Sequence, residues 1–166
     1  VALTDASALV LGTVGVGQNL AVTSSGDLTQ TGVLTVAGTS SFDVGANDLT
    51  LSDVANDFIG AVTVTINAAN NLTIADASAY EIQSGLNVNN LTLTSGGAIT
   101  QAGALDVDGI SSFTAGANAI TLTNASNDFT GAISLSNTGS NDVALTDASA
   151  LVLGAVGVGQ NLAVIS

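Results

Sequence analysis

The chain of 166 residues carries 13 acidic residues and no Lys, Arg or His, so its formal net charge is −13. It also lacks Pro, Cys, Met and Trp. Without cationic side chains the protein cannot neutralise a phosphate backbone or an anionic membrane surface, which excludes nucleic-acid binding. Because Cys, His and Lys are absent, zinc sites built from Cys and His, Ser-His triads, Cys nucleophiles and Schiff-base lysines are also excluded. No stretch approaches the roughly 18 uninterrupted apolar residues of a membrane-spanning helix, so we expect no membrane insertion.

Short strands are predicted along the whole chain by one recurring signature: an apolar residue, then Thr or Ala, then another apolar residue. Such alternation is typical of a half-buried strand whose apolar side chains point inward. The expected strands are 1–3, 20–22, 49–51, 72–74, 91–93, 120–122, 143–145 and 162–164. The intervals between their starting points are 19, 29, 23, 19, 29, 23 and 19. Intervals near 20 residues match one turn of a parallel β-solenoid, so the sequence predicts an all-β solenoid of about seven turns.

The sequence also repeats on two longer scales. Val1–Ser24 returns as Val143–Ser166 with 22 of 24 positions identical, which defines a 142-residue repeat. A weaker 71-residue repeat pairs Ser40–Phe42 with Ser111–Phe113, and the strand intervals close on the same period. We therefore predict one continuous solenoid over residues 1–166, with units 1–71 and 72–142 and a partial third unit, 143–166. Each 71-residue unit is expected to make roughly three turns.

A column of side-chain amides accompanies the predicted strands. The residue two positions before each of the last seven strands is always Asn or Gln: Gln18, Asn47, Asn70, Asn89, Asn118, Asn141 and Gln160. Asn is common in turns for its own reasons, because it tolerates a bent backbone. In stacked turns, however, such amides would lie above one another and form a hydrogen-bonded ladder. We expect a structural amide ladder at one corner of the solenoid.

Two more features repeat with the 71-residue unit. The four phenylalanines occupy matching positions, which suits stacking in the interior: Phe42, Phe58, Phe113 and Phe129. The 29-residue interval contains an extra strand-like segment, Leu34–Val36, which returns as Leu105–Val107. We interpret it as an additional side or a bulging loop of one long turn.

The acidic residues are spaced in a way that a solenoid can tolerate. Adjacent turns lie about 4.8 Å apart, so an acid repeated on every turn would bring like charges into contact. Asp5, Asp76 and Asp147 recur only once per unit. Three turns would separate them by about 14 Å, which exceeds the Debye length of about 8 Å at physiological salt. We expect like charges to avoid one another in the stack.

Several segments resemble the repeats of filamentous-haemagglutinin-like bacterial exoproteins. The similar segments are Asn71–Ile74, Ala98–Leu105, Ile120–Asn124 and Asn127–Ile133. Those exoproteins are large secreted adhesins whose shafts are right-handed parallel β-helices. The resemblance implies a right-handed coil for this chain, an extracellular or bacterial cell-surface location and a role in adhesion.

The leading functional hypothesis is structural. The near-identical 142-residue repeat suggests an extracellular fibre or adhesin stalk, extended by self-association or by continuation of the same chain into a filament. A solenoid has unpaired strands at its two ends, which are templates for further stacking. The alternative is a binding module for ice or carbohydrate. Outward hydroxyl pairs favour ice binding, namely Thr50 with Ser52, Thr92 with Thr94, and Thr121 with Thr123.

Catalysis and resident cofactors are not expected. Asp106 and Asp108 lie two residues apart on a predicted strand, and a pair of carboxylates can perform acid–base chemistry. Their counterparts one unit earlier are Thr35 and Ala37, and the chain has no His or cation to tune them. Calcium is the one cofactor that the acids suggest, because Asp oxygens are suitable ligands. The Gly-Gly-x-Gly-x-Asp repeat of calcium-loaded β-rolls is absent.

Overall fold

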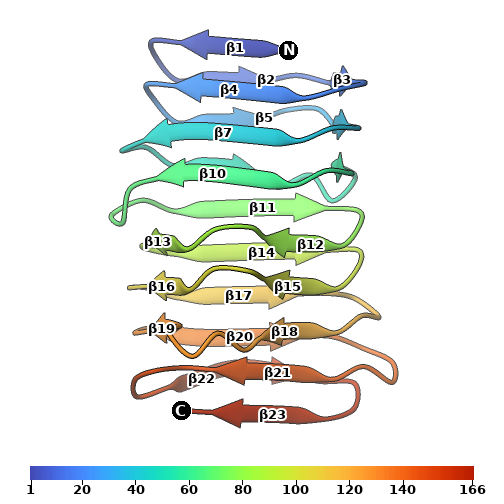
Figure 1. Ribbon diagram of the computed structural model, residues 1–166, viewed down its shortest axis with the longest axis vertical. Coiled ribbons are helices and arrows are strands. Elements are labelled where there is room, and N and C mark those ends of the chain that lie inside the picture. The colour runs from blue at the N-terminus through green and yellow to red at the C-terminus, as the bar shows by residue number, and fades with distance from the viewer.

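A computed structural model describes residues 1–166 and shows a single coil of 23 short β-strands without helices. Every strand pairs only with parallel neighbours, and the chain descends from the N-terminus to the C-terminus in flat, stacked turns (Figure 1). Each turn has three sides, and residues one turn apart become register partners, as Ala2 and Ala21 or Leu49 and Leu72 show. The coil in Figure 1 is right-handed, the usual hand for connections between parallel strands. The predicted right-handed parallel β-solenoid is therefore confirmed.

Five parallel sheets form the sides of the coil. The common sheet runs its whole length with eight strands: β2 (Leu9–Leu11), β5 (Leu28–Gln30), β8 (Leu49–Leu51), β11 (Leu72–Asp76), β14 (Leu91–Ser95), β17 (Ser111–Thr114), β20 (Ala132–Ser136) and β22 (Val152–Gly157). The N-terminal half adds a four-stranded sheet: β1 (Ala2–Asp5), β4 (Leu20–Ser24), β7 (Ser40–Gly45) and β10 (Val62–Ile66). It also adds a three-stranded sheet: β3 (Val14–Val16), β6 (Leu34–Val36) and β9 (Asp57–Phe58).

The C-terminal half has two sheets of its own. The five-stranded sheet contains β12 (Tyr80–Ile82), β15 (Ile99–Gln101), β18 (Ile120–Leu122), β21 (Val143–Thr146) and β23 (Leu162–Ile165). The second three-stranded sheet contains β13 (Leu86–Val88), β16 (Leu105–Val107) and β19 (Asp128–Phe129). Because each turn contributes one strand to the common sheet, the coil has about eight turns, which agrees with the predicted count of about seven.

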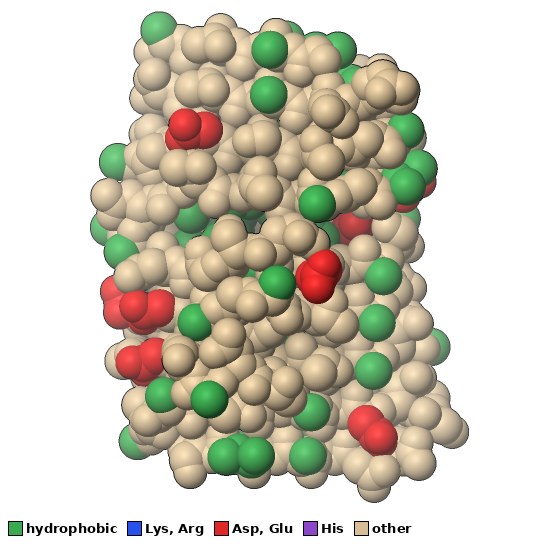
Figure 2. Space-filling model, in the orientation of Figure 1, with side chains coloured by type: hydrophobic (Ala, Val, Ile, Leu, Met, Phe, Trp, Pro, Cys, Tyr) green, Lys and Arg blue, Asp and Glu red, His purple; other side chains and the backbone are tan.

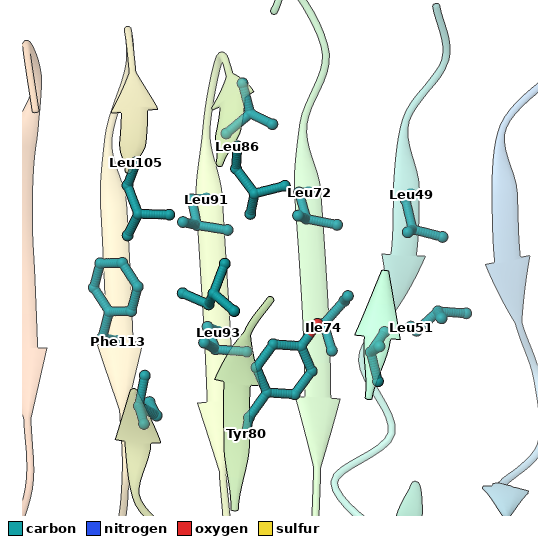
Figure 3. Packing of buried hydrophobic residues seen from close by; sticks show 14 of the residues in the cluster. Leu49, Leu51, Leu72, Ile74, Tyr80, Leu86, Leu91, Leu93, Leu105 and Phe113 are labelled. Carbon is teal, nitrogen blue, oxygen red and sulfur yellow. The ribbon is translucent and has the colours of Figure 1, made fainter. Parts of the chain in front are cut away.

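The core consists of aliphatic side chains stacked from turn to turn. In β4 and β14 the first, third and fifth residues are buried, as strand alternation requires. Of the buried hydrophobic residues, 33 form one continuous cluster. Register partners place like above like along the common sheet, where Figure 3 shows two parallel rows: Leu49, Leu72 and Leu91, and beside them Leu51, Ile74 and Leu93. Burial of each such side chain contributes about 1.5–3 kcal/mol, so the stack stabilises itself without any salt bridge.

The repeat unit is longer than three turns. Residues 1–71 contain ten strands, β1 to β10, and residues 72–142 contain the equivalent ten, β11 to β20. With three strands per turn, one unit makes three and one third turns. The unit therefore makes roughly the three turns that were predicted, and the additional third of a turn rotates each unit relative to the one before it. Each unit begins one side further round the axis, so β1, β11 and β21 belong to three different sheets.

The 29-residue interval is the source of this rotation. Leu34–Val36 is neither a bulge nor an extra side, because β6 is the ordinary third side of its turn and pairs with β3 and β9. The interval from Leu20 to Leu49 instead spans four strands, which is one turn and one further side. The other two intervals of the unit are single turns.

A junction lies where the first unit meets the second. In each unit one side carries strands of four to six residues and the other two sides carry strands of two or three. The unit both starts and ends on its long side, so two long strands, β10 and β11, follow one another round the coil. Beneath β10 lie two short strands, β12 and β13, which do not pair with it. Only the common sheet crosses this junction, through the pairing of β8 with β11 and of β11 with β14.

The last turn departs from the repeat. In the first unit, Leu9–Leu11 and Val14–Val16 form separate strands on two sides. Their near-identical copies merge into one bulged strand, β22, which pairs with β20 on a single side. The residues of β22 and β23 are exposed because no turn covers them. Nothing in the chain forms a helix that is both long and apolar enough to span a lipid bilayer.

Candidate functional site

The seven amides do not form a single ladder. They lie before strands of three different sheets, because the unit rotates by one side. No side-chain hydrogen bond joins any two of the seven, which are Gln18, Asn47, Asn70, Asn89, Asn118, Asn141 and Gln160. Three of them donate instead to the carbonyl three residues earlier in their own turn, as Asn47 Nδ2 does to Val44 O at 2.8 Å. Their structural role is to close turns.

A shorter ladder exists one position later in the sequence. Asn71 Nδ2 donates to Asp48 Oδ2 at 3.0 Å, and Asn90 Nδ2 donates to Asn71 Oδ1 at 2.7 Å. Ile110 N–H then donates to Asn90 Oδ1 at 2.8 Å. The bonds from the backbone and side chain of Asn71 lower the pKa of Asp48. The residue directly before each strand therefore carries the side-chain contacts between turns at this corner.

Two buried asparagines, which are not among the amides predicted from the sequence, each hold three turns together. Asn127 is fully buried; its Oδ1 accepts hydrogen bonds from Leu105 N at 3.0 Å and Gln101 Nε2 at 2.8 Å. Its Nδ2 donates to Gln101 Oε1 at 2.9 Å, to Leu122 O in its own turn and to Thr146 O in the next. Asn56 makes the matching bonds one unit earlier. The signal was present in the sequence, because both the Asn and its Gln partner recur at the 71-residue offset.

The four phenylalanines form two pairs in the core. Phe42 and Phe58 belong to the same turn and meet edge to face, with ring centroids 5.8 Å apart. Phe113 and Phe129 repeat this arrangement at 6.2 Å. All four are buried. Each pair therefore makes its contact across the interior of one turn, and the rings do not stack along the axis of the solenoid.

The acids are not kept apart everywhere. Asp5, Asp76 and Asp147 lie on different sides as well as different turns, because β1, β11 and β21 belong to different sheets. Asp106 and Asp128, however, are register partners on adjacent turns. Burial raises the pKa of Asp106, and the charges of Asp108 and Asp128 raise it further. The expectation that like charges avoid one another is wrong at this position.

The acids of this region have polar neighbours and no metal cluster. Asn87 Nδ2 donates to Asp106 Oδ2 at 3.0 Å, and Ser149 Oγ donates to Asp128 Oδ1 at 2.8 Å. Asp108 is exposed, and Asp106 is half-buried. No group of three or more Asp or Glu side chains lies close enough together to hold a metal ion.

Outward hydroxyl groups form a column on the common sheet. Register pairing aligns six of them on successive turns: Thr29, Thr50, Thr73, Thr92, Ser112 and Ser134. A second, shorter column contains Thr94, Thr114 and Ser136. Thr121 lies on the five-stranded sheet, where its partner is Ala144. The three hydroxyl pairs suggested for ice binding therefore do not form one face.

One cavity opens at the junction between the two units. It has a volume of about 250 Å³ and lies between the start of β10 and the end of β11 with β12; its lining is Phe58, Ile59, Gly60, Ala61, Val62, Asp76, Ala79, Tyr80, Glu81 and Gln83. Figure 2 shows the molecule hollowed at mid-height of this face, with acidic side chains beside the hollow. The cavity follows from the strand mismatch, because β10 has no paired strand beneath it. Phe58, Val62, Asp76 and Tyr80 are buried in its wall, and Glu81 is exposed.

Asp76 is the unusual member of this lining. Its Oδ1 accepts hydrogen bonds from Phe58 N at 3.2 Å and from the backbone and hydroxyl of Ser78. Its Oδ2 is buried and has no hydrogen-bond partner. Burial raises the pKa of Asp76 despite these bonds, and nearby Asp57 adds to the effect. Burial and the Asp76 charge also raise the pKa of the Tyr80 hydroxyl.

Three cavity residues break the repeat. Where the junction has Tyr80, Glu81 and Gln83, the first unit has Leu9, Val10 and Gly12, and the third has Leu151, Val152 and Gly154. Tyr80 is the only Tyr of the chain and Glu81 the only Glu. Neither residue is predicted to belong to a site, because nothing in the sequence shows that they share a cavity.

The parallel ladders, the three-sided turns and the 71-residue period define a repeat protein of the β-solenoid class. The family model described as repeats of unknown function (DUF5649) matches residues 1–65 and 69–136, and the chain belongs to this family. The first match ends at residue 65 and the second at residue 136, which agrees with the 71-residue unit found in the sequence. Searches of curated proteins and of solved structures find no match.

Proposed function

We propose that this chain is a structural, non-catalytic segment of an extracellular fibre or adhesin stalk on a bacterial cell surface. A shaft of this kind must be extended, uniform and able to grow without new types of contact. One aliphatic core and one common sheet run through all eight turns, which meets the first two requirements. The resemblance to filamentous-haemagglutinin-like repeats supports the cell-surface location.

The observation that carries the proposal is the equivalence of the first and last strand pairs. Ala2 pairs with Ala21 between β1 and β4, and Ala144 pairs with Ala163 between β21 and β23. Both pairs use the same 19-residue register in almost identical sequence. The third unit thus starts with the pairing that started the first, on a different side of the coil. Further units can continue this pattern in one chain, or copies can stack through the unpaired edges of β1 and β23.

The proposal is tested by lengthening the solenoid. One chain carries an additional copy of residues 1–71 ahead of Val1, and another carries an additional copy of residues 1–142. At about 4.8 Å per turn, the first insertion adds about 16 Å and the second about 32 Å, with an unchanged cross-section. Small-angle X-ray scattering measures both quantities. A thicker particle, or two lobes joined by a flexible segment, would contradict a structural shaft.

The alternative of an ice- or carbohydrate-binding module has one observation in its favour, the six-residue hydroxyl column on the common sheet. Its spacing of about 4.8 Å is regular, but the second column beside it is only three residues long. Thermal hysteresis of concentrated protein tests ice binding, and a glycan array tests carbohydrate binding. Replacement of Thr73 and Thr92 by Val should abolish either activity if this column is the binding surface.

A further inference from the structure

We propose that the junction cavity is a binding site for a small organic cation, a primary ammonium group on a short alkyl stem. This inference is independent of the proposed role as a shaft, because the cavity is complete within one chain. Its residues are Asp76, Tyr80, Glu81 and Gln83 together with the apolar wall of Phe58 and Val62.

The cavity presents hydrogen-bond acceptors with few donors. Asp76 Oδ2 is buried without a partner, although a buried polar atom ordinarily has one. Glu81 adds a second carboxylate, of which Oε2 accepts a bond from Gln83 Nε2 at 2.6 Å. The Tyr80 hydroxyl and the Gln83 amide can each donate and accept, but the two carboxylates can only accept when ionised. A complementary ligand must therefore bring donors, and an ammonium group brings three donors and no acceptor.

The charge of the ligand follows from the charge of the chain. No side chain in the protein is cationic, so Asp76 has no internal counter-ion. A net charge of −13 also raises the local concentration of cations around the molecule. A bare metal ion fits less well, because no three carboxylates converge there.

The walls and the size of the cavity favour an organic cation. Phe58 and Val62 line it beside Tyr80, whose ring lies across the core next to Ile74 in Figure 3. Aliphatic methylene groups pack well on such walls, and an ammonium group is attracted to aromatic faces. A volume of about 250 Å³ is smaller than the roughly 300–1,000 Å³ of sites for drug-sized ligands, so the ligand is compact.

The repeat supplies a matched control for the key carboxylate. Asp147 is the equivalent of Asp76 and is also buried. Its Oδ1 accepts from Phe129 N at 2.9 Å, as Asp76 does from Phe58 N. No cavity opens beside its Oδ2, however, and the hydroxyl of Ser149, which donates to Asp128 Oδ1 at 2.8 Å, lies 3.5 Å from this oxygen. The two residues share their local fold and differ in the feature that the proposal uses.

The experiment is an NMR titration of the 166-residue chain with n-butylammonium chloride, using n-butanol and sodium chloride as control ligands. We expect saturable shifts confined to the amides of residues 58–62 and 76–83, with butanol at least tenfold weaker. Asp76→Asn should weaken binding at least tenfold, whereas Asp147→Asn should change it by less than twofold. A second titration uses Nα-acetyl-lysine amide, which carries a lysine side chain. Binding as tight as that of n-butylammonium would identify a lysine of a partner protein as the source of the ammonium group.

A second variant protects the test against misfolding of the first. Tyr80→Leu, Glu81→Val and Gln83→Gly together give the junction the residues of the first and third units, which the solenoid already accommodates. This variant should keep the β-sheet circular dichroism spectrum and lose binding. Equal binding by the Asp76 and Asp147 variants, shifts spread over all carboxylates, or equal affinity for butanol would overturn the proposal.

Discussion

At the scale of single residues, a few buried polar groups determine the register between successive turns. A core of stacked aliphatic side chains has no preferred register of its own, because one Leu packs on another in several positions. Asn56 and Asn127 fix the register, since each bonds to the turn before it and the turn after it. Unpaired buried donors and acceptors are costly, so a slipped register would be penalised at once.

Replacing Asn127 by Ala should therefore lower the free energy of unfolding by about 2–4 kcal/mol. The change leaves the buried Leu105 N without its partner, at about 1–3 kcal/mol, and removes two bonds from Gln101, whose Nε2 still donates to Gly103 O. Asn19→Ala is the control, because Asn19 is exposed and its side chain accepts one bond, from Thr39 N. Urea denaturation measures both variants. Equal losses in the two would contradict the role given to the buried amide.

Asp76 should make stability depend on pH. Burial raises its pKa in the folded state, so the folded protein binds a proton that the unfolded chain releases. The contribution of this bound proton to the free energy of unfolding is complete below the pKa of Asp in the unfolded chain, about 4. It is lost as the pH rises through the pKa of Asp76 in the folded protein. We expect Asp76→Asn to match the wild type at about pH 4 and to be more stable at about pH 7.

Thermal denaturation across this range measures the difference between the two proteins. Asp147→Asn provides the comparison, because it removes an equivalent carboxylate and the same unit of net charge. A wild type that gains stability over Asp76→Asn as the pH rises would show that the hydrogen bonds to Oδ1 outweigh burial.

At the scale of strands and turns, the fold depends on how closely successive corners approach. Gly131 lies over Gly109, and Gly60 over Gly38, so the same contact occurs once in each unit. A Cβ atom on Gly131 or Gly60 would collide with the carbonyl of the glycine in the adjacent turn. These corners need glycine for closeness of approach, since neither Gly131 nor Gly60 has a positive φ.

Gly131→Ala should destabilise the protein by roughly 1–3 kcal/mol, the usual range for forcing a methyl group into a packed site. Gly17→Ala is the matched control. Its added Cβ has no heavy atom within 4 Å, so we expect a change within about 0.5 kcal/mol. Chemical denaturation compares the two variants. A neutral Gly131→Ala would mean that the corner can move apart without weakening the ladders.

At the scale of the whole molecule, the rotation of the unit controls the surface. Any feature that recurs with the 71-residue unit returns one side further round, and three units restore the original side. Recurring acids therefore follow a spiral and do not accumulate on one face. The rotation has a structural cost at the junction, where two sheets end and two others begin. The cavity is the consequence of that change of sheets.

With 13 acids and no cationic side chain, stability should rise with ionic strength. Added salt screens repulsion, and here it has no salt bridges to weaken. We expect the melting temperature to increase between about 10 mM and about 1 M sodium chloride, as the Debye length falls from about 30 Å to about 3 Å. Asp128→Asn should reduce this increase, because it removes the in-register contact with Asp106. A melting temperature that falls with salt would contradict the expectation.

The parts of the fold that the sequence predicts are those that depend on local periodicity. Alternation in segments such as Leu91–Leu93 identifies strands, and their regular spacing along the chain identifies turns of a solenoid. The seven amides recur in the sequence as predicted, but they do not form one ladder, because successive units start on different sides of the coil. The cavity residues Tyr80 and Glu81 could not be assigned to a site, since their neighbours Phe58 and Val62 come from the preceding turn.

The order of residues by itself determined the strands, the 71-residue period and the inward-facing aliphatic positions, because each of these follows from side-chain alternation within short segments. Tertiary structure alone decided which side of the coil each strand occupies. That choice depends on the number of strands in one unit. Ten strands fill three complete turns of three sides, and the tenth strand begins a fourth turn. This remainder turns the unit about the axis, divides the amides among different sheets and opens the one cavity beside Asp76.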